Sequence, residues 1–323
     1  MRFSRVAVLA LVLGLSLSGC NTLSTLGSAA DEADISSGLE ALETELEGIP
    51  GVTGATSSMP MEADLKFVVS VALDTDGLDA DGAQAVVAAL TDTFAGEKFL
   101  EQPNLSFTIA SATDPIVNIP QWIGLPVDEL AAEFEYLYEL QAVYGEQLAM
   151  DLLLTDPTST GVYQRSITAA TAPATVDWAA MRAVPDSTTA DPVWMLPGAY
   201  LLKTLPPERL DTLVEAVGEA DVAGSATVTW FGADDTFTLS VVPDVLAADS
   251  FTDLDAWDTI VSLLEQAASP GLGLKEFAIA EDGRGAVVHT GSCDVPVTKR
   301  DKQLAKDLAA SGITLTAGTC TIH

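Results

Sequence analysis

The stretch Leu65-Lys66-Phe67-Val68-Val69-Ser70-Val71-Ala72-Leu73 places a large apolar residue at every second position, which is the pattern of a half-buried β-strand. A related alternation, Thr236-Phe237-Thr238-Leu239-Ser240-Val241-Val242, follows 170 residues later. At this offset, thirteen of the 63 positions from 48 to 110 are identical without a gap. Composition alone predicts roughly five identities, so we interpret the pattern as an internal duplication.

Hydrophobic periodicity around these strands predicts the same order of elements, αββαβ, in both copies. Each expected unit is too small to bury both faces of its own three-stranded sheet, so its helices cover one face. The first copy comprises an expected helix containing Leu39, Leu42 and Leu46, strands 52–59 and 65–73, helix 83–95 and strand 105–109; the second comprises helix 208–217, strands 225–231 and 236–242, helix 254–268 and strand 275–280.

The predicted fold class is therefore α+β, with two homologous αββαβ units whose sheets are antiparallel or mixed. The first unit is expected over 36–112 and the second over 206–323, the latter with a helix and a strand added at its C-terminal end. A middle segment, 113–205, joins them. It is expected to hold one long amphipathic helix over 127–154 and strand-like pieces at 162–168 and 193–202.

Gly-Val-rich turns precede the first strand of each copy, as Ile49-Pro50-Gly51-Val52-Thr53-Gly54 and Val222-Ala223-Gly224. Together with the αββαβ order, these turns resemble the BON domain of bacterial envelope proteins. The resemblance implies an association with membranes or phospholipids.

The first twenty residues predict export and lipidation. Arg2 and Arg5 precede the apolar run 6–15, which has the length of a secretory signal rather than of a transmembrane helix. The run leads into Leu17-Ser18-Gly19-Cys20, which resembles the lipobox of bacterial lipoproteins. The resemblance implies cleavage of residues 1–19, a diacylglycerol on the Cys20 sulfur, and a protein held at the extracytoplasmic side of the cell membrane by its acyl chains. The Ser/Thr/Ala/Gly-rich residues 20–35 are then expected to form a flexible tether.

Composition limits the possible partners. The chain has 323 residues, of which 48% are hydrophobic, so it can bury a substantial core. Its 47 acidic residues against 14 basic ones give a net charge of −33. A surface this negative repels phosphate backbones, which excludes nucleic acids as partners.

Two further cysteines, Cys293 and Cys320, are expected to form one disulfide in an oxidising extracytoplasmic compartment. The bond would fasten the C-terminal helix and strand to the strand before them, and it would stabilise the fold by roughly 3–4 kcal/mol in the chain-entropy model. A metal-binding pair or two free thiols are the alternatives.

Residues for familiar catalytic chemistry are scarce. The chain has no Gly-x-Ser-x-Gly nucleophile motif, and it has two histidines. It therefore offers few of the residues that a serine hydrolase or a histidine-ligated zinc site requires. Four carboxylates at Asp74, Asp76, Asp79 and Asp81 share a short Gly-containing loop that suits weak Ca²⁺ binding, although a solvated turn with acids at a helix start is the favoured explanation. No other cofactor is expected.

Trp122 and Trp194 lie near prolines of the middle segment and could line a ligand groove between the two units. We therefore expect a lipid-anchored protein that binds or scaffolds, without catalysis, an envelope protein or a small ligand. One alternative is a hydrolase that uses carboxylates between the two units. The other is a membrane-associated role of the BON type.

Overall fold

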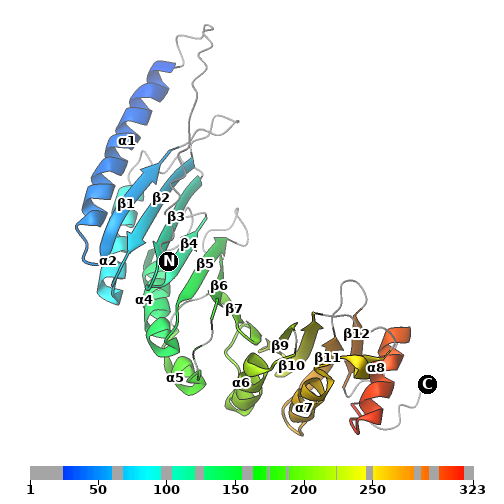
Figure 1. Ribbon diagram of the computed structural model, residues 1–323. Coiled ribbons are helices and arrows are strands. Elements are labelled where there is room, and N and C mark those ends of the chain that lie inside the picture. The colour runs from blue at the N-terminus through cyan, green and yellow to red at the C-terminus, as the bar shows by residue number, and fades with distance from the viewer. Residues whose placement is uncertain are drawn as a thin grey trace, which may run out of the picture.

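The computed structural model describes residues 25–59, 68–95, 104–120, 127–154, 163–171, 173, 175–186, 188, 190–222, 224–244, 250–279, 285–290 and 298–315. These residues form a mixed α/β structure built on one twelve-stranded sheet, in which the strands follow one another in chain order from β1 to β12. The expectation of a helix-covered mixed sheet is confirmed at this level. Figure 1 shows the sheet as a curved band, with the first helix at one end and the last at the other.

Hairpins and helices alternate along the described chain. The first helix, α1 (Thr25–Glu47), begins inside the stretch 20–35 that was expected to be a flexible tether, so residues 25–35 are helical instead. After α1, a strand pair followed by a helix recurs six times. The elements are β1 (Val52–Ser58), β2 (Val68–Thr75), α2 (Ala80–Phe94), β3 (Asn104–Ser111), β4 (Ile116–Ile119), α4 (Val127–Tyr144), β5 (Leu148–Leu154), β6 (Tyr163–Ala169), α5 (Trp178–Ala183), β7 (Asp191–Leu196), β8 (Ala199–Leu202), η1 (Glu208–Leu210), α6 (Asp211–Glu219), β9 (Gly224–Phe231), β10 (Thr236–Pro243), η2 (Phe251–Asp253), α7 (Trp257–Ala267), β11 (Leu274–Ile279), β12 (Ala286–His289) and α8 (Lys299–Ala310).

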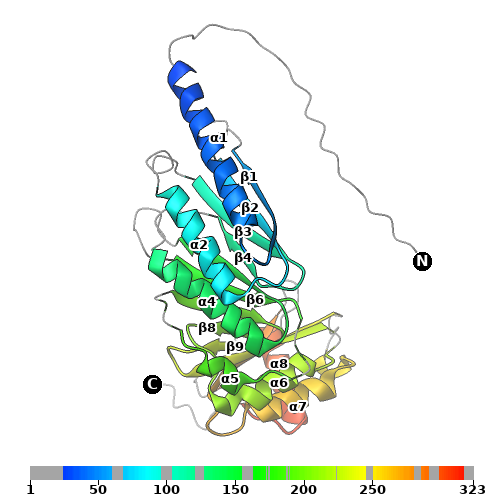
Figure 2. The same ribbon diagram turned by 90° about the vertical axis from the view of Figure 1, so that its left-hand side faces the viewer.

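Strand pairing follows the same alternation. The two strands of each hairpin are antiparallel, whereas the strands joined by a helix, such as β2 and β3 or β10 and β11, are parallel. Because a helical crossover between parallel strands has a fixed hand, successive crossovers that advance in one direction place their helices on one face of the sheet. Figure 2 shows α1, α2, α4, α5, α6 and α7 gathered on that face.

Helix α2 illustrates how the sequence specifies these elements. Asp79 caps its N-terminus by accepting a hydrogen bond from the backbone N–H of Gly82 (2.8 Å). Its apolar stripe of Val86, Val87, Leu90 and Phe94 is buried. Burial of this stripe against the sheet, rather than helix propensity alone, stabilises a helix of this length.

Two boundaries predicted for the middle segment are wrong. The long helix ends at Tyr144 instead of 154, because Gly145 adopts a φ of 83° and residues 148–154 form β5. The strand expected over 193–202 is a hairpin, in which Pro197 and Gly198 turn the chain between β7 and β8. In both places apolar residues resume directly after a short turn, so the hydrophobic pattern continues beyond it, although Gly145 and the Pro197-Gly198 pair are local turn signals.

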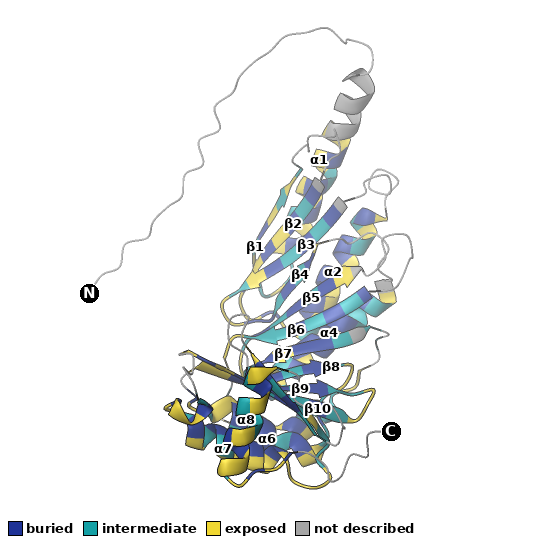
Figure 3. Cartoon of the chain, turned by 90° about the vertical axis from the view of Figure 1, so that its right-hand side faces the viewer, coloured by how far each residue is buried: buried dark blue, intermediate teal, exposed yellow. Residues whose placement is uncertain are grey.

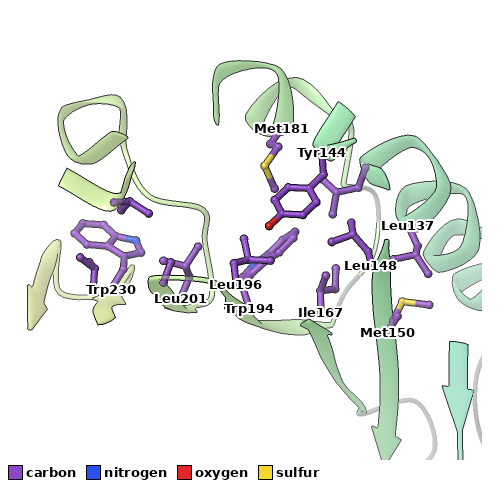
Figure 4. Close-up of a cluster of buried hydrophobic side chains, with 14 of the residues drawn as sticks. Leu137, Tyr144, Leu148, Met150, Ile167, Met181, Trp194, Leu196, Leu201 and Trp230 are labelled. Atoms are coloured by element: carbon purple, nitrogen blue, oxygen red, sulfur yellow. The ribbon is translucent and has the colours of Figure 1, made fainter. Parts of the chain in front are cut away.

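One hydrophobic core runs under the helices along the whole band. Figure 4 shows its central part, where Trp194 of β7, Tyr144 of α4 and Met181 of α5 lie together. Leu201 and Trp230 continue the core towards the second half of the chain. The middle segment is therefore part of the same sheet and core as the stretches on either side of it.

The two stretches expected to be units keep their predicted order of elements, α1-β1-β2-α2-β3 and α6-β9-β10-α7-β11, but they do not form separate sheets. Their strand registers also differ. Val71 lies opposite Phe107, whereas Val241, its equivalent at an offset of 170, lies opposite Ile279 instead of Phe277. The pairing has therefore shifted by two residues, which keeps the same side chains facing the helices.

No helix in the described ranges has both the length and the apolar composition needed to cross a bilayer.

Candidate functional site

A cluster of charged side chains is buried between α4 and the sheet. Arg165 of β6 donates to Glu133 of α4 (2.9 Å) and to Asp186, which follows α5 (2.5 Å). It also donates to the Thr188 hydroxyl (2.9 Å), and its guanidinium lies 4.5 Å from the centre of the Tyr136 ring. The side chains of Arg165 and Glu133 are both 0% exposed. The cluster therefore ties a helix, a strand and a loop together inside the core.

Burial and pairing set the protonation of this cluster. Burial raises the pKa of Glu133, although Arg165 and the Tyr163 hydroxyl act in the opposite direction. Partial burial acts to raise the pKa of Asp186 as well, but the hydrogen bonds and charge of Arg165 outweigh it and hold that pKa below its ordinary value. Since Arg165 and Glu133 are closed to solvent, the geometry suits a structural role better than contact with a substrate.

A polar cavity of about 450 Å³ lies where the β3–β4 turn meets the end of α4. Asp114 lines it, but both carboxylate oxygens already accept backbone N–H groups, from Gly77 and Leu78 (3.1 Å each). Gln147 donates to the carbonyls of Ser111 and Asp114 (2.9 Å each). The polar groups of this corner thus mainly hold the turn against the helix.

A second cavity, of about 60 Å³, lies between α5, the β7–β8 turn and α6. Trp178, Pro197, Val214 and Gly218 contribute to its mostly apolar walls. A space of this size accommodates only a few atoms, so it is a packing gap between elements rather than a ligand pocket.

The face of the sheet opposite the helices is open. No helix in the described part of the chain covers it, and Figure 3 shows its strands in a mixture of colours, because buried residues alternate with intermediate and exposed ones. Several of its polar groups pair across neighbouring strands. The hydroxyls of Ser70 and Ser106 lie 2.7 Å apart, the Asn118 amide donates to Asp151 (2.8 Å), and His289 lies 3.1 Å from Glu276.

Apolar residues gather at the centre of this open face. We define the open-face patch as Val193, Met195, Tyr200, Leu202 and Phe231, the apolar residues of β7, β8 and β9 that alternate with the core residues of these strands. Strand pairing sets its members side by side, with Val193 opposite Leu202, Met195 opposite Tyr200, and Leu202 opposite Phe231. Among the described residues, the exposed large apolar side chains are Leu153 (44%), Met195 (41%) and Val242 (46%), and all three belong to strands of this sheet. Within the patch Met195 is exposed, Tyr200, Leu202 and Phe231 are partly exposed, and Val193 is buried. Exposed apolar side chains grouped on one surface are typical of a protein–protein contact site.

The carboxylates predicted to hold Ca²⁺ have local tasks in the structure. Asp79 caps α2, Asp81 lies in the first turn of that helix, and Asp76 accepts a hydrogen bond from Thr113 (3.4 Å). Asp74 is exposed at the end of β2. In the ranges that the structure describes, no group of three acidic, histidine or cysteine side chains is arranged to hold a metal ion.

The other predicted site residues divide into buried and undescribed ones. Trp194 is 1% exposed and packs edge-on against Tyr136, with ring centres 6.2 Å apart. It is therefore a core residue and does not line an open groove, because it faces the helices. Trp122, Cys20, Cys293 and Cys320 lie outside the described residues.

Sequence reasoning missed both the charged cluster and the open-face patch. Arg165 has a visible signal, because it occupies an apolar position in the alternation Tyr163-Gln164-Arg165-Ser166-Ile167. Its partners Glu133 and Asp186 are distant in the chain, so they could not be identified. The patch could not be identified, because Met195 and Tyr200 were predicted to lie in one continuous strand over 193–202.

Comparisons with protein-family models, with curated proteins and with solved structures found no match for this chain.

Proposed function

We propose that this chain is a lipid-anchored, extracytoplasmic binding protein that uses the open-face patch to hold another protein of the cell envelope. The main observation behind this proposal is the patch itself, an apolar cluster at the centre of a sheet face that no described helix covers. A face of this kind supports binding, because covering it removes apolar surface from water at about 25 cal/mol per Å².

Charge favours one type of partner. The helices on the opposite face are rich in acidic residues, with sequences such as VDELAAEFEYLYELQ in α4 and DTLVEAVGE in α6. The net charge of −33 attracts a cationic protein over long range and repels an acidic one. The partner is therefore an envelope protein with an apolar contact surface that basic residues surround.

The binding experiment uses the unlipidated chain, without residues 1–20, immobilised and exposed to envelope extract at low and high salt. Met195→Glu places a charge in the patch, whereas Val242→Glu places the same charge on β10, outside the patch, at a residue of similar exposure. We expect a captured basic protein that Met195→Glu loses, that Val242→Glu retains, and that high salt weakens.

Three results would overturn this proposal. One is capture that Met195→Glu leaves unchanged, and another is equal loss in both variants. The third is co-sedimentation of the unlipidated chain with phospholipid vesicles, which would indicate a BON-like membrane role instead.

Anchoring through Cys20 rests on the lipobox-like sequence and has its own test. In the full chain, Cys20→Ser should abolish the incorporation of a labelled fatty acid and move the protein from the membrane fraction to the soluble fraction. Cys293→Ser is the matched control, because it removes a cysteine that is not part of the lipobox and should leave the protein in the membrane fraction. A Cys20→Ser protein that stays in the membrane fraction would contradict the anchor.

We further propose that stretches 36–112 and 206–323 derive from an ancestral duplication. The identities at an offset of 170 and the shared order of elements support this origin. If it is correct, homologues with other numbers of strand–strand–helix segments should exist, and they should keep the same offset between related stretches.

A further inference from the structure

The sheet has two edges, and an exposed edge is a potential pairing site for another strand. Among the described strands, β1 pairs only with β2, and β12 pairs only with β11. Every second backbone N–H and C=O group of such an edge strand points away from the sheet. An unprotected edge therefore favours association with a second chain.

A carboxylate covers the edge of β1. Glu43 of α1 accepts two hydrogen bonds with its Oε1 atom, one from the backbone N–H of Ser57 (2.5 Å) and one from the Ser57 hydroxyl (2.6 Å). Glu43 is half-buried between α1 and the strand. A backbone N–H of the edge strand is thereby engaged by a side chain of the preceding helix.

A carboxylate covers the edge of β12 in the same way. Asp301 of α8 accepts the backbone N–H of Val287 with its Oδ1 atom (2.9 Å). Its Oδ2 atom accepts the backbone N–H of Thr298 (2.7 Å), which completes the capping box of α8. Asp301 is 7% exposed.

The two carboxylates belong to the helices at opposite ends of the described chain. Figure 1 shows α1 beside β1 at one end of the band and α8 beside β12 at the other. Arrays in which each segment contacts only its neighbours need special terminal elements, since an uncapped end presents the surface that binds the next segment.

The geometry assigns Glu43 and Asp301 to edge protection, and the partner they exclude is a second copy of this chain. Within the sheet, each even-numbered strand is parallel to the odd-numbered strand that follows it, as β4 is to β5 and β8 is to β9. The β1 strand of a second copy, placed parallel to β12, would extend this pattern. Such head-to-tail pairing uses a different surface on each molecule, so it would join successive molecules into chains or rings.

The test compares Glu43→Ala, Asp301→Ala and the double variant by sedimentation velocity over a range of concentrations. We expect the wild type to stay monomeric and the double variant to form oligomers that dissociate on dilution, with each single variant less associated than the double. Loss of the Glu43 carboxylate should also speed exchange of the Ser57 amide hydrogen about tenfold, because a hydrogen bond to a charged group is lost.

Matched variants separate the hydrogen bond from other effects. Glu40→Ala removes the same charge from an exposed position of α1, and Glu43→Gln keeps an amide oxygen that can accept the Ser57 N–H. Thr298→Ala disrupts the capping box and leaves the carboxylate of Asp301 in place. All three should remain monomeric.

The proposal is overturned if the double variant stays monomeric while its circular dichroism matches that of the wild type. Equal association in Glu40→Ala or Thr298→Ala would also overturn it, because charge loss or helix fraying would then explain the result. A wild type that already forms head-to-tail chains would also overturn the proposal. None of these outcomes depends on the binding of another envelope protein.

Discussion

At the scale of single residues, the buried Arg165 cluster shows why one charge in the core requires its partners. Arg165 has no exposed side-chain surface, and it is neutralised by Glu133, which is equally buried, and by Asp186, which is 34% exposed. Taking charges out of water costs several kcal/mol per ion unless hydrogen bonds and opposite charges replace the water. The cluster therefore fixes α4, Asp186 and Thr188 in one position on the sheet.

Arg165→Met is expected to lower the free energy of unfolding by about 3–5 kcal/mol, because it leaves the buried Glu133 carboxylate without its counter-charge. Adding Glu133→Gln should recover much of this loss, since the glutamine is neutral and can still accept from Tyr163. Urea denaturation of both single variants and the double variant measures the coupling. Additive effects in the double variant would contradict a coupled pair.

The same cluster predicts a dependence of stability on pH. Because the pKa of Asp186 in the folded protein lies below its ordinary value of 3.8, its ionised form stabilises the fold above that pH, and the contribution is lost as the pH falls further. Glu133, whose pKa is raised, contributes in the opposite direction. The wild type should therefore exceed Asp186→Asn in stability at about pH 6, and the gap should narrow towards about pH 3. A gap that does not change with pH would contradict this assignment.

At the scale of elements, close backbone contacts decide how hairpins meet helices. Gly198 in the β7–β8 turn has a φ of 75°, and a Cβ there would lie 2.7 Å from the backbone N and Cα of Gly218 in α6. The turn and the helix can approach this closely because Gly198 lacks a side chain, whereas a Cβ at Gly218 would lie 3.5 Å from the Pro197 carbonyl oxygen, an ordinary contact. The contact helps to hold α6 against the sheet.

Gly198→Ala should therefore destabilise the protein by more than the strain of a positive φ alone would cause. Gly145→Ala is the matched control, because Gly145 also has a positive φ (83°), but a Cβ there would meet no atom within 4 Å beyond its chain neighbours. We expect about 1–2 kcal/mol for Gly145→Ala and about 1–3 kcal/mol more for Gly198→Ala. Thermal and urea unfolding measure both, and equal losses would show that α6 shifts freely.

Much of the element scale could be predicted from local pattern. The stripe of α2 and the alternation of β9 and β10 are properties of short segments, so they are visible without a structure. The ends of α4 and β7 were missed because apolar residues resume after each turn, although Gly145 and the Pro197-Gly198 pair are turn signals in the sequence. The partners of Arg165 were not visible either, because tertiary contacts bring them from separate segments.

At the scale of the whole molecule, one sheet and one core join segments that the sequence divides into units and a linker. The β6–β7 and β8–β9 pairings connect the middle segment to both sides, and Trp194, Leu201 and Trp230 belong to a shared cluster. No boundary with few contacts separates two domains within the described chain. Unfolding of one part therefore exposes the core of the next.

We accordingly expect one cooperative unfolding transition. Tryptophans lie in the middle segment (Trp178, Trp194) and in the second half of the chain (Trp230, Trp257), so their fluorescence reports on both. Fluorescence and far-ultraviolet circular dichroism should give the same urea midpoint. Two separate transitions would instead support independent units at the two ends.

The class of structure, the αββαβ order in the two similar stretches and the lipobox-like start could all be read from the amino-acid sequence, because each depends on residues close together in the chain. Tertiary contacts were needed to establish that the twelve described strands form one sheet, that Trp194 is buried, and that Glu43 and Asp301 lie over its edges. These features depend on which strand pairs with which and in what register. Pairing is a competition among many similar apolar strands, and contacts between distant segments settle it.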